Sequence, residues 1–186
     1  GCDEVIAMVR GFDACATEVT INRHRLGCNG NTVASIERGF GISDFVLHIE
    51  EDLLIAPDGL RYFAWARNRY RDTSNITSIT GYNRVPTPGD PYAVHTRRWF
   101  HPWLLGLWED RWATCRGLNF SVNKTWDCIL HSHFMPDPSS PNREAYPALS
   151  RTQNIGAKST IHDPRWFSPE WHAINQHVPH WAGNMT

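Results

Sequence analysis

Short apolar runs separated by polar turns recur along the chain, and the clearest covers residues 45–49. Its length and β-branched content favour a buried strand over a helix. An acidic triplet at residues 50–52 follows directly, and a second apolar run comes after it. Asp58 is then a favourable N-cap for a helix whose apolar spacing continues to residue 70. The segment 45–70 is therefore predicted to fold as strand, acidic turn and helix.

The rest of the chain alternates in the same way. We expect strands at residues 4–9, 18–22, 75–80 and 93–100, and helices at residues 32–40, 103–113 and 123–131. Two segments rich in proline, residues 81–91 and 135–147, predict loops.

The acidic triplet lies where a strand is expected to leave a sheet. In open α/β sheets, ligands bind at the carboxyl edge of the strands. Neighbouring carboxylates repel one another and are costly there unless a cation or water compensates their charge. Their oxygens suit magnesium or manganese, usually with substrate phosphates completing the shell. A strand end capped by solvated acids is the alternative that the triplet alone leaves open.

The sequence around the triplet resembles the acidic metal motif of GT-A glycosyltransferases. Residues 50–53 (E-E-D-L), 56–58 (A-P-D) and 62–63 (Y-F) are similar to the E-D-D-L-x-x-A-P-D-x-x-x-Y-F block of the N-acetylglucosaminyltransferase I family and its protein-O-mannose relative. Residues 149–152 (L-S-R-T) resemble the S-R-T segment near the end of that catalytic domain. The order and approximate spacing of the motifs are kept over residues 30–165.

The chain also departs from the family pattern. Glu51 stands where the family has Asp, and residues 101–106 replace a P-G-L-G-W element. Trp126-Asp127-Cys128 is the counterpart of the family's W-D-D-W, which holds its catalytic base.

The resemblance implies one GT-A-type domain over residues 1–186, an α/β fold with a mostly parallel central sheet and flanking helices. Residues 1–9 correspond to the second strand of that pattern, so the first strand and its helix are expected to be absent. The implied activity moves a sugar, such as N-acetylglucosamine, from a nucleotide diphosphate sugar to an acceptor hydroxyl on a glycan or another molecule, with inversion. A divalent metal, manganese or magnesium, is the expected cofactor.

The resemblance also implies roles for individual residues. Asp52 is expected to bind the metal, with Glu50 acting through water and His162 completing the shell. Asp127 is the expected catalytic base because it follows Trp126 as the family's acid does. A charge on a helix surface is the alternative for Asp127, and the fallback bases are Glu109 and Asp110.

Further substrate contacts are expected from Glu50, Glu51, Asn31, Arg151 and Gly106. Arg151 would lie near the phosphates by resemblance. Asn31 is the last residue of a polar, glycine-rich turn at residues 23–31. The turn begins with a basic trio, Arg23, His24 and Arg25, which is suited to a diphosphate. A solvated turn with Asn31 as a helix N-cap is the alternative.

Two other classes of protein stay open at this point. One is a non-catalytic domain on the same scaffold that binds a glycan or a protein partner, which the single Trp-Asp pair favours. The other is a nucleotidyltransferase, which would need a basic, glycine-rich opening loop. The pair His131 and His133 has the H-x-H spacing of zinc ligands, but no third ligand is evident in the sequence.

Composition narrows the partners and the compartment. The 186 residues are 41% hydrophobic and 20% charged with a net charge of −1, which predicts one globular domain with no general affinity for nucleic acid. No apolar run approaches the ~20 residues that cross a bilayer, and no signal peptide is recognisable. The five cysteines have no C-x-x-C spacing, which favours free thiols and a cytoplasmic location.

Overall fold

The computed structural model of the protein describes residues 2–121 and 123–156. The helices in this part of the chain are α1 (Cys2–Arg10), α2 (Gly27–Phe40), α3 (Gly59–Tyr70), α4 (Glu109–Ala113) and α5 (Trp126–Phe134). The strands are β1 (Phe45–His48), β2 (Leu53–Ile55), β3 (Ile76–Thr80), β4 (Val94–Arg97), β5 (Leu105–Trp108), β6 (Arg143–Pro147) and β7 (Thr152–Asn154).

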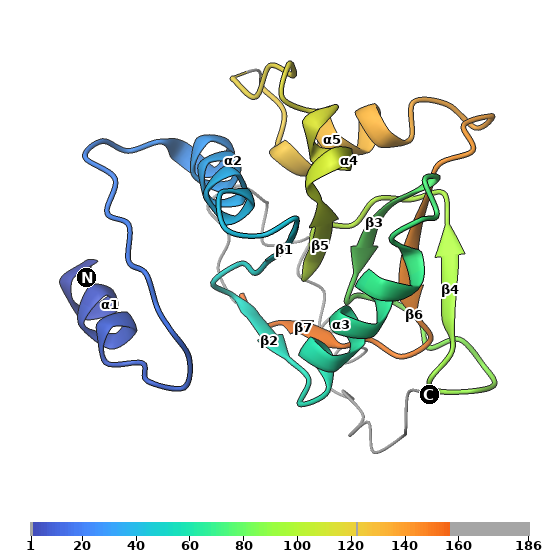
Figure 1. The fold of residues 1–186 in the computed structure, drawn as a ribbon, viewed down its shortest axis with the longest axis horizontal. Helices are drawn as coiled ribbons and strands as arrows, with labels where there is room; N and C mark the ends of the chain where they lie inside the picture. The colour runs from blue at the N-terminus through green and yellow to red at the C-terminus, as the bar shows by residue number, and fades with distance from the viewer. Residues whose placement is uncertain (1, 122, 157–186) are drawn as a thin grey trace.

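The main sheet has the strand order β1-β5-β3-β6-β4, and β2 pairs with β7 in a separate sheet (Figure 1). In the main sheet β3 and β6 pair in parallel, whereas the other neighbouring strands pair antiparallel. It follows that β1, β3 and β6 run in one direction and that β5 and β4 run in the other. The ends of β1, β3 and β6 therefore share one edge of the sheet with the start of β5.

The predicted α/β class is confirmed, but the predicted mostly parallel sheet is wrong. The difference arises because β5 lies between β1 and β3 and is antiparallel to both. Apolar periodicity marks a strand without fixing the direction of its partners, so the sequence pattern did not reveal this mixed sheet.

Two apolar clusters cover opposite faces of the sheet. One contains side chains of α2, α4 and α5, and the other contains side chains of α3. Strand β5 contributes to both, because Leu105 and Leu107 enter the first cluster and Trp108 enters the second. Alternate strand residues point to opposite faces, so the fold is a helix–sheet–helix sandwich, with α3 in front of β3 and β6 in Figure 1.

Several predicted elements are confirmed with shifted ends. The strands expected near residues 45–49, 75–80 and 93–100 are β1, β3 and β4, and the run after the acids is β2. The helices expected at residues 32–40 and 123–131 are α2 and α5, and α3 follows Asp58. Asp58 occupies the predicted N-cap position of α3, but its side chain makes no capping hydrogen bond.

The helix predicted at residues 103–113 is wrong in its first half. Residues 105–108 form β5, and α4 begins only at Glu109. All of β5 is buried, so no alternation of polar and apolar residues marks it as a strand. Glycine is required at position 106, because a Cβ there would lie 2.9 Å from the Phe63 ring.

The N-terminal strands predicted at residues 4–9 and 18–22 are wrong. The first segment is the helix α1, and the second has no regular structure. Asp3 and Glu4 in the first turn and Arg10 in the last favour a helix through its dipole, and short apolar runs fit either structure. Figure 1 shows α1 set apart from the sheet, joined to α2 by an extended segment.

The proline-rich segment at residues 135–147 is only partly a loop. Its last five residues form β6, which pairs with both β3 and β4. The Arg143 N–H donates to the Asn75 carbonyl (2.8 Å) at the start of this strand. The prolines at 136, 138 and 141 precede the strand and Pro147 is its last residue, so none of them interrupts the middle of the ladder.

The sequence also predicted free cysteines and no apolar segment long enough to cross a bilayer. Cys15, Cys28, Cys115 and Cys128 are free thiols, as predicted. Within residues 2–121 and 123–156, none of the helices has the length and apolar character needed to cross a bilayer.

Candidate functional site

A cavity of about 1050 Å³ opens where β1 ends, beside the N-terminal turns of α2 and α5. Its lining includes five residues that the sequence proposed for the site: Asn31, Glu50, Glu51, Asp52 and Asp127. These residues come from α2, from the turn between β1 and β2, and from α5. The fold therefore gathers side chains that are nearly a hundred positions apart in the sequence.

The acidic triplet occupies the turn that follows β1. Glu50 and Asp52 are half-buried, and Glu51 is exposed. The Ile155 N–H donates to the Asp52 carbonyl (2.8 Å), and a Cβ on Gly156 would lie 2.6 Å from Asp52 Oδ2. Gly156, two residues after β7, thus makes room for the Asp52 carboxylate.

The carboxylates in the cavity act on one another electrostatically. Burial first, and then the charges of Asp52, Asp127 and Glu51, raise the pKa of Glu50 to about 7. The pKa of the Cys28 thiol in α2 is raised by burial and by the charges of Glu50, Glu51 and Asp127. Asp127 therefore belongs to the same charged cluster as the triplet.

Asp127 is placed by a contact between two helices. It lies half-buried in the first turn of α5. The Trp126 N–H donates to Asn29 Oδ1 (2.8 Å), and Asn29 Nδ2 donates to the carbonyls of Phe120 (2.9 Å) and Lys124 (2.8 Å). Asn29 in α2 thereby fixes the start of α5, a role that sequence reasoning missed because it depends on long-range contacts.

The α2 side of the cavity carries the polar residues expected from the turn before it. His24 and Arg25 line the cavity with Asn31. Asn31 is exposed, and its Oδ1 accepts a hydrogen bond from Asn22 Nδ2 (3.0 Å). It lies inside α2, which begins at Gly27, so the alternative of Asn31 as an N-cap is excluded.

Two predicted substrate contacts lie elsewhere. Gly106 is in the middle of the sheet, where its lack of a side chain serves packing. Arg151 is fully buried, and its Nε forms an ion pair with Asp58 Oδ2 (2.8 Å) at the start of α3. Neither residue lines the cavity. The predicted metal ligand His162 lies outside the described residues.

Carboxylates of the kind that line the cavity are common ligands of divalent cations. Burial and the neighbouring carboxylates raise the pKa of Glu50, so its ionised form is disfavoured and a nearby positive charge would stabilise it. Among the described residues, no group of three His, Cys, Asp or Glu side chains is arranged to hold a metal. Magnesium and manganese sites often combine one or two carboxylates with phosphates of a substrate.

Two aromatic or imidazole groups in the cavity were not assigned to the site from the sequence. Trp103 lines the cavity together with Pro102, in the segment where the chain departs from the family pattern. His48, at the end of β1, packs edge-on against Trp126 (5.3 Å between ring centroids). Burial lowers the pKa of His48 to about 4, so this ring is neutral at physiological pH.

Comparison with known proteins gives no match: no family model matches the chain, and no curated protein matches its sequence.

Proposed function

We propose that this protein is a metal-dependent glycosyltransferase that moves a sugar from a nucleotide diphosphate sugar to an acceptor hydroxyl. The observation that supports this most strongly is the shared cavity. The triplet proposed for metal and donor binding, the asparagine proposed for the nucleotide and the proposed base all line it. Asn31 and Asp127 are distant from the triplet in the sequence, and the cavity contains all of these residues, as the proposal requires.

The proposal includes a GT-A-type fold. The three strands β1, β3 and β6 run in the same direction, and the acids follow the first of them. This arrangement supports the proposal because ligands of α/β sheets bind beyond the carboxyl ends of such strands.

The proposal assigns a separate chemical role to each of the polar residues that line the cavity. Asp52 would hold a manganese or magnesium ion, with Glu50 acting through water, and this ion would neutralise charge on a diphosphate leaving group. Glu51 and Asn31 would contact the donor, and the basic pair on the α2 side is suited to its phosphates. Asp127 would accept the proton of the acceptor hydroxyl. Attack on the face opposite the leaving group inverts the anomeric carbon.

The proposal is tested by calorimetry with manganese and uridine diphosphate, followed by product analysis with a panel of nucleotide sugars. We expect Asp52→Asn to lose metal-dependent binding of the nucleotide, because the amide removes the negative charge that holds the cation. The melting temperature should stay close to that of the wild type. Glu109→Asn is the matched control, because Glu109 lies outside the cavity. Equal nucleotide binding by wild type and Asp52→Asn would contradict the metal assignment.

A non-catalytic glycan- or partner-binding domain is the second candidate. It is favoured by the single Trp-Asp pair at residues 126–127, where the resembled family has W-D-D-W. Glycan binding without binding of manganese or nucleotide would favour this candidate over the transferase.

A further inference from the structure

The turn before β5 lies beside the acidic triplet. The register pairs His48, the last residue of β1, with Leu105, the first residue of β5. Residues that follow β1 therefore run next to residues that precede β5. Trp103 and Glu50 both line the cavity.

The backbone of this turn is held in an unfavourable conformation. Leu104 has φ = 51°, the one positive φ among the described non-glycine residues. The Gly81 N–H donates to its carbonyl (2.8 Å), and Thr80 Oγ1 donates to the carbonyl of Trp103 (2.9 Å). A side chain on Gly81 would meet the Leu104 side chain at 2.6 Å. Strain of this kind persists where surrounding contacts enforce it, and it is concentrated at functional sites.

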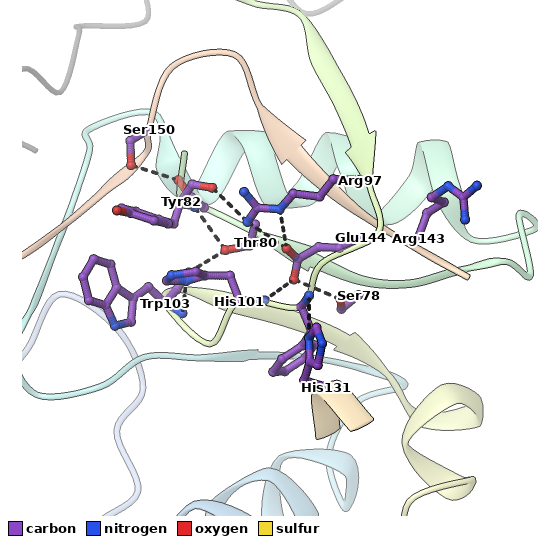
Figure 2. Close-up of polar contacts among 12 residues, drawn as sticks. Ser78, Thr80, Tyr82, Arg97, His101, Trp103, His131, Arg143, Glu144 and Ser150 are labelled. Atoms are coloured by element: carbon purple, nitrogen blue, oxygen red, sulfur yellow. Dashed lines mark hydrogen bonds and ion pairs between the residues drawn. The ribbon is translucent and has the colours of Figure 1, made fainter. Parts of the chain in front are cut away.

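A buried ionic network anchors the turn to strand β6 (Figure 2). Glu144 in β6 is fully buried and accepts two hydrogen bonds from the Arg97 guanidinium (Nε, 3.0 Å, and Nη2, 2.8 Å). Its other oxygen accepts the His101 N–H (2.8 Å) and the Ser78 hydroxyl (3.2 Å). The backbone two residues before Trp103 is thereby fixed to the centre of the sheet.

Aromatic neighbours orient the indole of Trp103. Its ring lies edge-on to Tyr82 (4.6 Å, 71°) and to His101 (5.0 Å, 80°). The backbone N–H of Trp103 donates to His101 Nδ1 (3.3 Å). Trp103 is half-buried, packs against the core cluster that contains α3, and also lines the cavity.

We propose that Trp103 is an aromatic platform that binds a sugar ring of the acceptor beside the acidic triplet. The choice of a saccharide as the ligand rests on the proposed transferase function. A fixed indole offers a large apolar surface at low entropic cost. A pyranose ring presents apolar C–H groups on one face and hydroxyls at its rim, which matches an indole bordered by carboxylates.

The test uses protein labelled with 5-fluorotryptophan and observed by ¹⁹F NMR. The chain has nine tryptophans, and the resonance missing from Trp103→Phe identifies Trp103. Methyl glycosides of mannose, galactose and N-acetylglucosamine are titrated without donor. We expect one of them to shift the Trp103 resonance. Trp103→Leu, which keeps apolar packing, should bind it roughly tenfold more weakly, whereas Trp103→Phe should retain most of the affinity.

Trp99→Leu is the matched control, because this tryptophan is 55% exposed and does not line the cavity. Its affinity should equal that of the wild type. If Trp103→Leu does not fold, the shift of the Trp103 resonance in the wild type decides the question. The proposal is overturned if no glycoside shifts that resonance, or if uridine diphosphate with manganese shifts it instead.

The outcome is separable from that of the proposed transferase activity. If the wild type neither binds nucleotide nor turns over, but a glycoside shifts the Trp103 resonance, the transferase proposal is rejected and the sugar-binding role of Trp103 is retained. Turnover with the same acceptor KM in wild type and Trp103→Leu keeps the transferase and rejects the platform.

Discussion

The environment of the Asp127 carboxylate is set by the helix that carries it and by the other acids of the cavity. It lies in the first turn of α5, and its charge raises the pKa of Glu50 across the cavity. A general base needs an acceptor within hydrogen-bond reach and a pKa suited to the working pH. Asp127 lines the same cavity as the triplet, which is the placement that the proposed base needs.

We expect Asp127→Asn to lower turnover by roughly a hundredfold or more, because the amide cannot accept the acceptor's proton. Binding of manganese and nucleotide should be retained, since the metal ligand is unchanged. Asp110→Asn serves as control, because Asp110 pairs with Arg71 (3.0 Å) outside the cavity. Steady-state kinetics and calorimetry on both variants check this, and wild-type turnover in Asp127→Asn would remove the base assignment.

Among the secondary-structure elements, β5 and its preceding turn have the greatest influence on the site. The strand lies between β1 and β3 in the sheet, and its first residue follows directly after the left-handed Leu104. The same backbone path that completes the sheet therefore brings Trp103 to the cavity. Stability and site geometry are linked at this turn.

Substitution by glycine at two positions measures the strain in the turn. Leu104 and Leu107 are both completely buried, but only Leu104 has a positive φ. Truncation of a buried leucine costs about 2–5 kcal/mol, and glycine at Leu104 recovers about 1–2 kcal/mol of conformational strain. Leu104→Gly should therefore lose less free energy of unfolding than Leu107→Gly. Urea denaturation of both variants tests this, and an equal or larger loss in Leu104→Gly would argue against stored strain.

For the whole molecule, buried titratable groups make stability depend on pH in two opposing ways. Burial lowers the pKa of His101 to about 3 with help from Arg97, and it raises the pKa of Glu144 to about 7 against the effect of Arg97. The unfolded chain binds a proton at His101 below its ordinary pKa of 6.5, whereas the folded chain does not. Glu144 acts in the opposite sense, because the folded state retains its proton to higher pH.

The contribution of His101 is isolated by comparing wild type with His101→Asn, whose amide oxygen replaces the ring acceptor for the Trp103 N–H. The pKa of His101 is lower in the folded state than in the unfolded state. Its contribution to the stability of the folded state is therefore complete above pH 6.5 and declines as the pH falls towards 3. The difference in unfolding free energy between the two proteins should shrink by up to about 1.4 kcal/mol per pH unit in that range. Chemical denaturation between pH 4.5 and 7.5 measures it. A difference that is constant with pH would contradict the assignment.

The local sequence predicted those elements whose apolar spacing is unambiguous. The run before the acids, the helix after Asp58 and the buried strand near residue 76 all form where the pattern placed them. The pattern failed where burial on both faces removes periodicity, as in β5, and where a short apolar run suits two structures, as in α1. Proline content also disguised β6, because three prolines directly precede the strand and Pro147 is its last residue.

The candidate site was predictable residue by residue but not as a site. The position of the triplet directly after a strand is a property of the sequence, since a turn must follow an apolar run that ends in charged residues. That Asp127 and Asn31 share a cavity with it depends on Asn29, whose hydrogen bonds join α2 to the start of α5. Local propensity contains no information about such contacts.

The sequence by itself determined where strands and helices form around the acids, because those choices depend on neighbours a few positions apart. Only the tertiary structure decided the direction of the strands, the entry of β5 between β1 and β3, and the presentation of Trp103 beside Glu50. These features depend on pairing and packing between residues far apart in the chain. Their free energies come from burial and hydrogen bonds that exist only once the whole domain has folded.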